Sequence, residues 1–366
     1  MKNVLHTIDT NETGGAESIF LTLAATLDPS KFRSIVAIKS EGWIAEQLRK
    51  LGLNPLFVDA TGSFNLKYLY QLVRIIRKYK IDIIQSHLFG SNVYCSLAGW
   101  ICRVPVVSVF HGFVDVNPAS RLIATKFRIL NMGSTSVVFV SQSLRNAFQK
   151  VGMVSAEKSL VIYNGVDTSV FCRDRNHSIR AQLGLAENDI VIGSIGDVRQ
   201  AKGYDILLHA AAQVVEKSPR YKFLIAGDTS GPLYQELLKL RNHLGLNKHV
   251  FFLGFREDVA QVLNNFDVFL LSSTTEGFSI ATIEAMACGL PVVVTRSGGP
   301  EEIVTDAKDG LLVDVVSPSQ IASALELLTN DKALRERLEL GARETVVSRF
   351  SMNAMLRAYE ELYARL

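Results

Sequence analysis

Two glutamates separated by seven residues are the first candidates for chemistry in this chain. Glu276 lies in a polar stretch, whereas Glu284 lies in a run of small and apolar residues that predicts a helix ending at Gly289. The two carboxylates are therefore expected at different heights over one pocket. A carboxylate at Glu284 could accept two hydrogen bonds from a vicinal diol such as that of a ribose. An ordinary capped helix would also explain this pair of residues.

The elements around these glutamates are expected to place them at the end of a parallel strand. Residues 268–271 form a short apolar run, and the loop that follows it contains Glu276. Open parallel sheets bind ligands at the carboxyl ends of their strands. The N–H groups of Gly277, Phe278 and Ser279 are expected to open the helix, where unpaired donors and the positive end of the dipole favour a hydroxyl or a phosphate.

A second loop, after a strand predicted at residues 190–195, carries two cations. Arg199 and Lys202 lie in this loop, just before a helix predicted at residues 206–215. Two cations beside a helix N-terminus would stabilise the negative charge of a phosphate, or of a departing phosphate group, without a metal ion. We assign this role to Arg199 and Lys202, and a solvated basic loop is the structural alternative.

Three further candidates lie in the first half of the chain. Gly14 and Gly15 precede a predicted helix, where glycines let the backbone approach an anion, although a plain tight turn explains them nearly as well. His111 follows an apolar strand, as does His87. A lone histidine is more often structural than catalytic, and for His87 the sequence leaves both explanations open.

Strands and helices alternate along the whole chain, which indicates two doubly wound α/β domains. In the first half, the expected elements lie at residues 34–39, 44–51, 55–58, 66–80, 83–86, 92–102 and 106–110. A length of 366 residues is enough for two such domains. Residues 172–178 are expected to form the linker, and residues 344–366 a final helix.

Composition and charge exclude several classes of protein. With 48% hydrophobic and 20% charged residues the chain is globular, and we expect neither a secretory signal nor a transmembrane helix. The four cysteines form no metal-ligand pattern, so reduced thiols in the cytoplasm are expected. No nucleic-acid partner is expected.

The two halves differ in charge. Residues 1–183 hold 21 Lys+Arg and 12 Asp+Glu, a net charge of 21 − 12 = +9. Because the whole chain has a net charge of +3, residues 184–366 have a net charge of 3 − 9 = −6. Basic side chains gather in the helix expected at residues 66–80 and recur at Arg121, Lys126 and Arg128. Either set could lie on an anionic membrane, and a solvated basic face is the alternative.

The ordered set of motifs resembles the retaining glycosyltransferases of family 4, which have the GT-B fold. The resemblance is carried by Glu276 and Glu284 with the segments Gly289-Leu290-Pro291-Val292-Val293, Gly298-Gly299-Pro300-Glu301-Glu302, Gly14-Gly15-Ala16-Glu17 and Asn164-Gly165-Val166-Asp167. It implies two Rossmann-like domains facing across a cleft. Residues 1–171 would form the acceptor domain, with a helix at about 350–366 packing back on it, and residues 172–349 would bind the donor.

The resemblance also implies a function for individual residues. Glu284 would hold the ribose of the donor nucleotide, and Glu276 and His111 would contact the donor sugar. Gly14 and Gly15 would line the cleft near the donor phosphates, while Arg256 would lie beside the nucleotide base. The chain departs from the family pattern at one place. Asp197 stands where an arginine is commonest, and Arg199 follows two residues later.

The expected reaction is transfer of a sugar from a UDP- or GDP-sugar to a hydroxyl of a glycan or lipid-linked acceptor, with retention of configuration. The resemblance suggests cell-surface polysaccharide or lipopolysaccharide synthesis, with peripheral contact to the cytoplasmic face of the membrane. No Asp-x-Asp motif occurs, in agreement with metal-independent transfer. The alternatives are a nucleotide-sugar epimerase or hydrolase of the same fold and a non-catalytic nucleotide-sugar-binding subunit.

Overall fold

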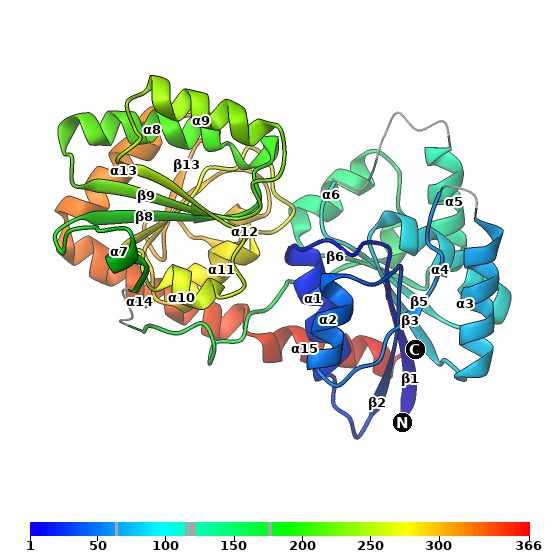
Figure 1. Ribbon diagram of the computed structural model, residues 1–366. Helices are drawn as coiled ribbons and strands as arrows, with labels where there is room; N and C mark the ends of the chain where they lie inside the picture. The colour runs from blue at the N-terminus through cyan, green and yellow to red at the C-terminus, as the bar shows by residue number, and fades with distance from the viewer. Residues whose placement is uncertain (63–64, 114–115, 117–121, 175–177) are drawn as a thin grey trace. The chain divides into compact units, whose positions relative to one another are not determined.

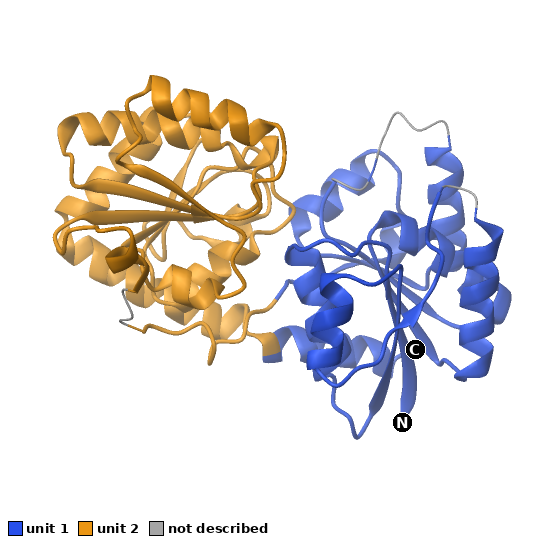
Figure 2. Cartoon of the chain, viewed as in Figure 1, with its two compact units in different colours: residues 1–164, 353–366 blue, residues 165–352 orange. Residues whose placement is uncertain are grey.

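The computed structural model describes residues 1–62, 65–113, 116, 122–174 and 178–366. The chain divides into two compact units (Figure 2). Unit 1 comprises Met1–Asn164 and Asn353–Leu366, and unit 2 comprises Gly165–Met352. The division thus follows Asn164, whereas the sequence placed it after Phe171. Arg121, most of the segment from Gly112 to Arg121, and the centre of the expected linker lie outside the described residues.

Unit 1 is built on a parallel sheet of seven strands in the order β3-β2-β1-β4-β5-β6-β7 (Figure 1). The strands are β1 (Lys2–Ile8), β2 (Phe32–Ile38), β3 (Leu56–Phe57), β4 (Ile83–His87), β5 (Val106–Phe110), β6 (Ser136–Phe139) and β7 (Ser159–Val161). Every strand pair is parallel. The order changes direction between β1 and β4, which is the topological switch point of this sheet.

Helices cover both faces of the unit 1 sheet. They are α1 (Gly15–Thr26), α2 (Trp43–Lys50), α3 (Leu66–Lys78), α4 (Phe89–Cys102), α5 (Ile123–Gly133) and α6 (Gln142–Lys150), with the 3-10 turn η1 (Ala156–Lys158). On one face, side chains of α3 and α4 pack with Leu5. On the other, side chains of α1 and α2 pack with Ile8. Alternate residues of one strand thus fill two separate cores.

The end of the chain packs on unit 1. Helix α15 (Met352–Ala364) lies against the start of the chain, where Lys2 Nζ donates to the carbonyl oxygen of Tyr363 at 2.9 Å. The Glu360 carboxylate accepts from the Asp28 amide at 3.0 Å, and the rings of Phe32 and Tyr363 meet edge to face. Both ends of the chain therefore belong to the same unit.

Unit 2 contains a parallel sheet of six strands in the order β10-β9-β8-β11-β12-β13. Its strands are β8 (Ile190–Ile195), β9 (Tyr221–Ala226), β10 (Val250–Gly254), β11 (Val268–Leu271), β12 (Val292–Thr295) and β13 (Leu311–Val313). Counted from β8, this is the 3-2-1-4-5-6 order of the doubly wound dinucleotide-binding fold. The two parallel α/β sheets confirm the fold class expected from the sequence.

The helices of unit 2 also lie on both faces of its sheet, with α8, α9 and α13 on one side (Figure 1). They are α7 (Ser178–Gln182), α8 (Tyr204–Lys217), α9 (Leu233–His243), α10 (Val259–Leu263), α11 (Ile280–Ala287), α12 (Pro300–Ile303), α13 (Pro318–Asn330) and α14 (Lys332–Arg349), with the 3-10 turn η2 (Gln200–Lys202). Among the helices that the structure describes, none is both long and apolar enough to cross a membrane.

The expected continuous helix over residues 344–366 was wrong. Helix α14 ends at Arg349 and α15 begins at Met352, with Ser351 in an extended bridge to Val166. The Met352 amide donates to the carbonyl oxygen of Val166 at 2.8 Å, and the Val166 amide donates to that of Phe350 at 2.9 Å. These two bonds replace helical ones, so the break costs little hydrogen bonding.

Candidate functional site

The site of unit 2 is built from the two loops that leave its central strands. Strands β8 and β11 are neighbours at the point where the strand order changes direction. Residues 196–203 follow β8, and residues 272–279 follow β11. Both loops therefore emerge at the carboxyl edge of the sheet, where open α/β sheets bind their ligands.

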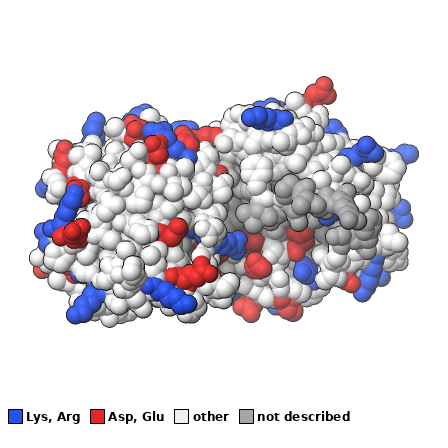
Figure 3. Space-filling model, turned by 90° about the horizontal axis from the view of Figure 1, so that it is seen from above, with Lys and Arg blue, Asp and Glu red and all other residues white. Residues whose placement is uncertain are grey.

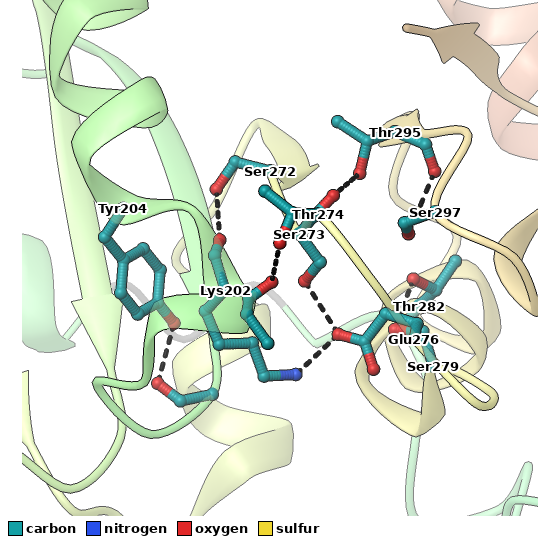
Figure 4. Close-up of polar contacts among 12 residues, drawn as sticks. Lys202, Tyr204, Ser272, Ser273, Thr274, Glu276, Ser279, Thr282, Thr295 and Ser297 are labelled. Carbon is teal, nitrogen blue, oxygen red and sulfur yellow. Dashed lines mark hydrogen bonds and ion pairs between the residues drawn. The ribbon is translucent and has the colours of Figure 1, made fainter. Parts of the chain in front are cut away.

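An ion pair joins these two loops (Figure 4). Lys202 Nζ lies 2.7 Å from Glu276 Oε1, and Ser273 Oγ donates to the same oxygen at 2.7 Å. The Lys202 side chain is 24% exposed and that of Glu276 is 12% exposed, so the pair is shielded yet reachable from solvent. A charge-assisted bond of this kind fixes both side chains before any ligand arrives.

Main-chain contacts hold Lys202 in place. Ser272 Oγ donates to the carbonyl oxygen of Lys202 at 2.8 Å, and the Thr274 amide donates to that of Ala201 at 2.8 Å. Gly203 has a φ of +60°, and a Cβ at this position would overlap the carbonyl oxygen of Ser272. Only glycine fits both requirements without strain. The β8 loop is therefore pinned to the β11 loop on both sides of the cation.

The main chain of Glu276 is fixed from the other side. Its amide donates to the carbonyl oxygen of Ser297 at 2.8 Å, and its carbonyl oxygen accepts from the Gly299 amide at 3.1 Å. Gly299 packs so closely on the Gly277 carbonyl that a Cβ there would overlap it. The loops after β8, β11 and β12, which are neighbouring strands in the sheet, are thus joined by hydrogen bonds.

Helix α11 begins at Ile280, so the amides of Gly277 and Phe278 precede its first turn. Ser279 caps the helix: its Oγ accepts from the Thr282 amide at 3.3 Å and from Thr282 Oγ1 at 2.8 Å. The Phe278 ring is buried and packs against Phe350, 5.7 Å between centroids. Phe278 can therefore offer a ligand only its main chain.

Arg199 lies at the exposed edge of the β8 loop. Its Nη2 atom is 3.3 Å from Asp197 Oδ2, and its side chain is 51% exposed. Asp197 Oδ1 accepts from the Asp228 amide at 3.0 Å, which ties the β8 loop to the loop after β9. Asp197 therefore both orients Arg199 and links two loops, functions that the sequence did not suggest.

Glu284 lies one turn into α11 and is half-buried. Burial raises the pKa of its carboxyl to about 7. Desolvation is the sole cause of this shift, so among the described residues no donor stabilises the carboxylate. A carboxyl group desolvated in this way can be stabilised by ligand hydroxyls.

Arg256 follows β10 in a loop of its own. Its Nε lies 2.7 Å from Asp258 Oδ1 and its Nη2 lies 2.5 Å from Asp258 Oδ2, a bidentate pair. The two charges lower the pKa of the Asp258 carboxyl and raise that of the Arg256 guanidinium. The fork of Arg256 is thus fixed within its own loop, which leaves its planar faces for a ligand.

In unit 1 the glycine loop follows β1. Gly14 precedes α1 and Gly15 is its first residue. The Glu17 carboxylate folds back so that a Cβ on Gly14 would lie 2.6 Å from its Oε2 atom. An acidic oxygen therefore lies at the place where the sequence suggested an anion. This loop favours hydroxyl groups over phosphates unless Glu17 moves.

His111 and His87 lie together in unit 1. His87 Nδ1 is 2.9 Å from His111 Nε2, and the two ring planes are nearly parallel, 19° apart, with centroids 5.1 Å apart. Burial lowers the pKa of His111 to about 4 and holds that of His87 well below its usual range. Both imidazoles are therefore neutral at pH 7.

Within unit 2, the sequence-predicted Lys202 and Glu276 are in direct contact. Ser273 and the linking function of Asp197 were not predicted from the sequence. Ser273 could have been found, since it is the second residue after the end of strand β11 and polar residues at strand ends line ligand sites.

Two family models match the chain. "Glycosyltransferase Family 4" matches residues 13–170, and "Glycosyl transferases group 1" matches residues 176–345. The D-inositol 3-phosphate glycosyltransferase of Corynebacterium jeikeium is 30% identical over 310 residues, covering 78% of this chain and 72% of that protein. An Escherichia coli UDP-Gal:alpha-D-GlcNAc-diphosphoundecaprenol alpha-1,3-galactosyltransferase is 27% identical over 309 residues. The match covers 82% of this chain and 79% of that protein.

A solved structure matches both units. The crystal structure of Anabaena Alr3699/HepE in complex with UDP-glucose has a TM-score of 0.90 and 25% identity, with 100% of both chains covered. Its likeness extends over both parallel α/β sheets and agrees with the GT-B fold. From the matched models, the relatives and the fold, the chain belongs to glycosyltransferase family 4 and is a retaining, nucleotide-sugar-dependent glycosyltransferase.

Proposed function

We propose that this chain transfers the sugar of a UDP-sugar, or as second candidate a GDP-sugar, to a hydroxyl of a lipid-linked or glycan acceptor in cell-surface polysaccharide or lipopolysaccharide synthesis. The observation that carries the proposal is the Lys202–Glu276 pair at the switch point of unit 2. The likeness to a structure holding UDP-glucose supports uracil as the base. The Escherichia coli relative, whose name states a diphosphoundecaprenol acceptor, supports a lipid-linked acceptor.

In the proposed reaction, the bond between the anomeric carbon and the diphosphate breaks, and its electron pair leaves with the diphosphate oxygen. The acceptor hydroxyl attacks the same face of the sugar, and its proton passes to the leaving phosphate. Lys202 and Arg199 stabilise the charge that the diphosphate gains. Their positive charges replace a metal ion in this proposal.

The remaining residues bind and orient the donor. Glu284 accepts the hydroxyls of the ribose, and Arg256 lies beside the base. Glu276 and the amides of residues 277–279 orient the sugar, and His111 contacts it. The pinned loops after β8, β11 and β12 support this assignment because preorganised groups lose little entropy when the donor binds.

Titration of the protein with nucleoside diphosphates, without added metal, tests the donor class. We expect UDP or UDP-sugars to raise the melting temperature by roughly 5–10 °C at a hundredfold excess over Kd. Differential scanning fluorimetry with UDP, GDP, ADP and their glucose conjugates provides the measurement. A larger shift with GDP would identify the second candidate.

Absence of any shift in the folded protein would refute nucleotide binding, and with it both the proposed donor class and the alternative of a nucleotide-sugar-binding subunit. A separate incubation of the bound nucleotide sugar without acceptor distinguishes transfer from epimerisation or hydrolysis. A transferase should leave most of the donor unchanged, whereas a hydrolase would consume it and an epimerase would convert it to an equilibrium mixture of two nucleotide sugars.

Helix α3 supports the proposed contact with an anionic membrane. It carries four basic residues and no acidic one, while Leu66 and Tyr70 are 82% and 65% exposed. Its opposite face, with Tyr68, Leu72 and Ile76, is buried in the core. On the face drawn in Figure 3, Lys and Arg are interspersed with Asp and Glu. The proposal therefore rests on this one helix, not on a broad basic surface.

Charge reversal on α3 tests the membrane contact. Each basic residue near an anionic surface contributes about 1 kcal/mol, so the double variant Arg74→Glu/Arg77→Glu should bind anionic vesicles at least tenfold more weakly. Co-sedimentation with phosphatidylglycerol vesicles measures this binding. The double variant Lys239→Glu/Lys248→Glu makes the same charge change in unit 2 and should bind as the wild type does. Equal binding by both double variants would overturn the proposal.

A further inference from the structure

A hydrogen-bonded chain of polar side chains runs across one face of the unit 1 sheet. Gln85 and His87 lie on β4, with His6 opposite Gln85 on β1, and His111 directly follows β5. Gln85, His87 and His6 are fully buried. Burial lowers the pKa of His6 to about 3, and the other two imidazoles are likewise neutral at pH 7. Each neutral imidazole has one donor and one acceptor nitrogen.

The direction of the chain follows from the orientation of the Gln85 amide, whose Oε1 atom is buried without a hydrogen-bond partner among the described residues, and the opposite orientation would reverse both tautomers. The Nε2 atom of this amide can only donate, and it lies 3.1 Å from His87 Nε2, which must then accept. The proton of His87 is therefore on Nδ1, from which it is donated to His111 Nε2 at 2.9 Å. Since His111 Nε2 accepts, the proton of His111 is on Nδ1. One amide thus determines the tautomers of two rings.

The far end of this chain is unpaired. Among the residues that the structure describes, His111 Nδ1 is a buried atom without a hydrogen-bond partner. A buried N–H left unpaired costs free energy that a ligand oxygen can recover. Phe20 packs edge-on against the buried His87 ring at 5.5 Å, so this ring cannot turn without disturbing the core, and its hydrogen bond orients the facing edge of His111. The unpaired donor is consequently held in one direction.

We propose that His87 is a positioning residue that holds His111 as the Nδ1–H tautomer, so that His111 donates a hydrogen bond from Nδ1 to a sugar oxygen of the substrate. The inference rests on the proposed function, in which His111 contacts the transferred sugar. A neutral ring with Nδ1 protonated cannot take a proton at that atom. His111 would therefore orient the sugar and polarise its oxygen and would not act there as a general base.

Two substitutions of His87 separate positioning from simple packing. His87→Leu removes the donor to His111 and should lower kcat about 10- to 100-fold, the loss expected for a misdirected hydrogen bond in a site. His87→Asn keeps an amide N–H near the place of Nδ1–H and should restore most of this loss. His6→Leu removes an equally buried imidazole from the same face, bonded to Ser34 at 3.3 Å, and should leave kcat unchanged.

Nitrogen NMR of the wild-type protein reads the tautomers directly. With ¹⁵N-labelled histidine, long-range ¹H–¹⁵N correlation spectra should show His87 and His111 both protonated at Nδ1 between pH 6 and 8. A His111 protonated at Nε2 would overturn the proposal even if no variant folds. Wild-type kcat in a folded His87→Leu variant would overturn it as well.

The affinity for UDP, measured by calorimetry in each variant, distinguishes this proposal from the proposed function. Because the nucleotide-binding residues are assigned to unit 2, His87→Leu should bind UDP as the wild type does. If the wild type binds no nucleotide, the proposed function fails while the tautomers remain testable. If UDP binds equally but His87→Leu and His87→Asn lose equal activity, the positioning proposal alone fails.

Discussion

Replacement of Lys202 by methionine is expected to lower the rate of sugar transfer by about 10²- to 10³-fold, the loss typical for one preorganised donor to a developing charge. The wild-type pair of Lys202 and Glu276 is neutral overall, with 2.7 Å between its charged atoms. Methionine removes the cation and leaves the shielded Glu276 carboxylate, which would repel the departing diphosphate. Steady-state kinetics with the nucleotide sugar identified by titration gives the measurement.

Two control variants define what the loss means. Lys202→Arg keeps the charge and should retain more activity than Lys202→Met, although the planar guanidinium fits a point-charge site less well. Lys222→Met removes another shielded lysine of unit 2, 14% exposed and 4.0 Å from Asp189 at the opposite edge of the sheet. It should transfer at the wild-type rate. Transfer by Lys202→Met at the wild-type rate would disprove the assignment.

The fold could be predicted because its strands can be recognised in the sequence as short apolar segments. Residues 268–271 and 292–295 are apolar runs, and the structure buries both strands completely. Strands of a parallel sheet covered by helices on both faces read as continuous hydrophobic segments, unlike the alternating pattern of a half-exposed strand. Several such segments, separated by helical patterns, leave few architectures other than the doubly wound one.

The break between α14 and α15 could not be predicted for a physical reason. No proline or glycine lies at residues 349–352, so local propensity continues the helix. The break is set by Val166, which lies far away in sequence and supplies the hydrogen bonds that the helix loses. A long-range pairing of this kind has no local signature.

The candidate site was only partly predictable. Lys202 and Glu276 were proposed from their place in strand-end loops together with the resemblance to family 4, because each loop taken alone also had a structural explanation. The hydrogen bond from Ser273 to Glu276, and the one that Asp197 accepts from the loop after β9, depend on how three loops pack together. The Glu17 carboxylate beside Gly14 shows the same limit, because a glycine pair alone does not reveal which side chain fills the space it leaves.

Replacement of Glu284 by alanine is expected to weaken nucleotide binding by about 10²-fold or more. The carboxylate is proposed to accept two ribose hydroxyls, and hydrogen bonds to charged groups contribute about 1.5–3 kcal/mol each. Calorimetry with UDP against wild type and variant measures the loss. Glu339→Gln changes another partly buried carboxyl of unit 2, whose pKa is also raised by burial, and should bind UDP normally. Unchanged affinity in Glu284→Ala would disprove the ribose assignment.

The pKa of about 7 at Glu284 gives opposite pH dependences for binding and stability. Because the ionised form accepts the diol, affinity should rise about tenfold per pH unit below pH 7 and level off above it. The folded-state pKa lies above its ordinary 4.5, so the free energy of unfolding without ligand should fall as pH rises from about 4.5 to 7. Glu284→Gln should abolish both trends, which separates them from titration of the nucleotide phosphate. If affinity and stability both stay flat in the wild type, Glu284 is already stabilised by another donor, and it would not need a ribose to recover its cost of burial.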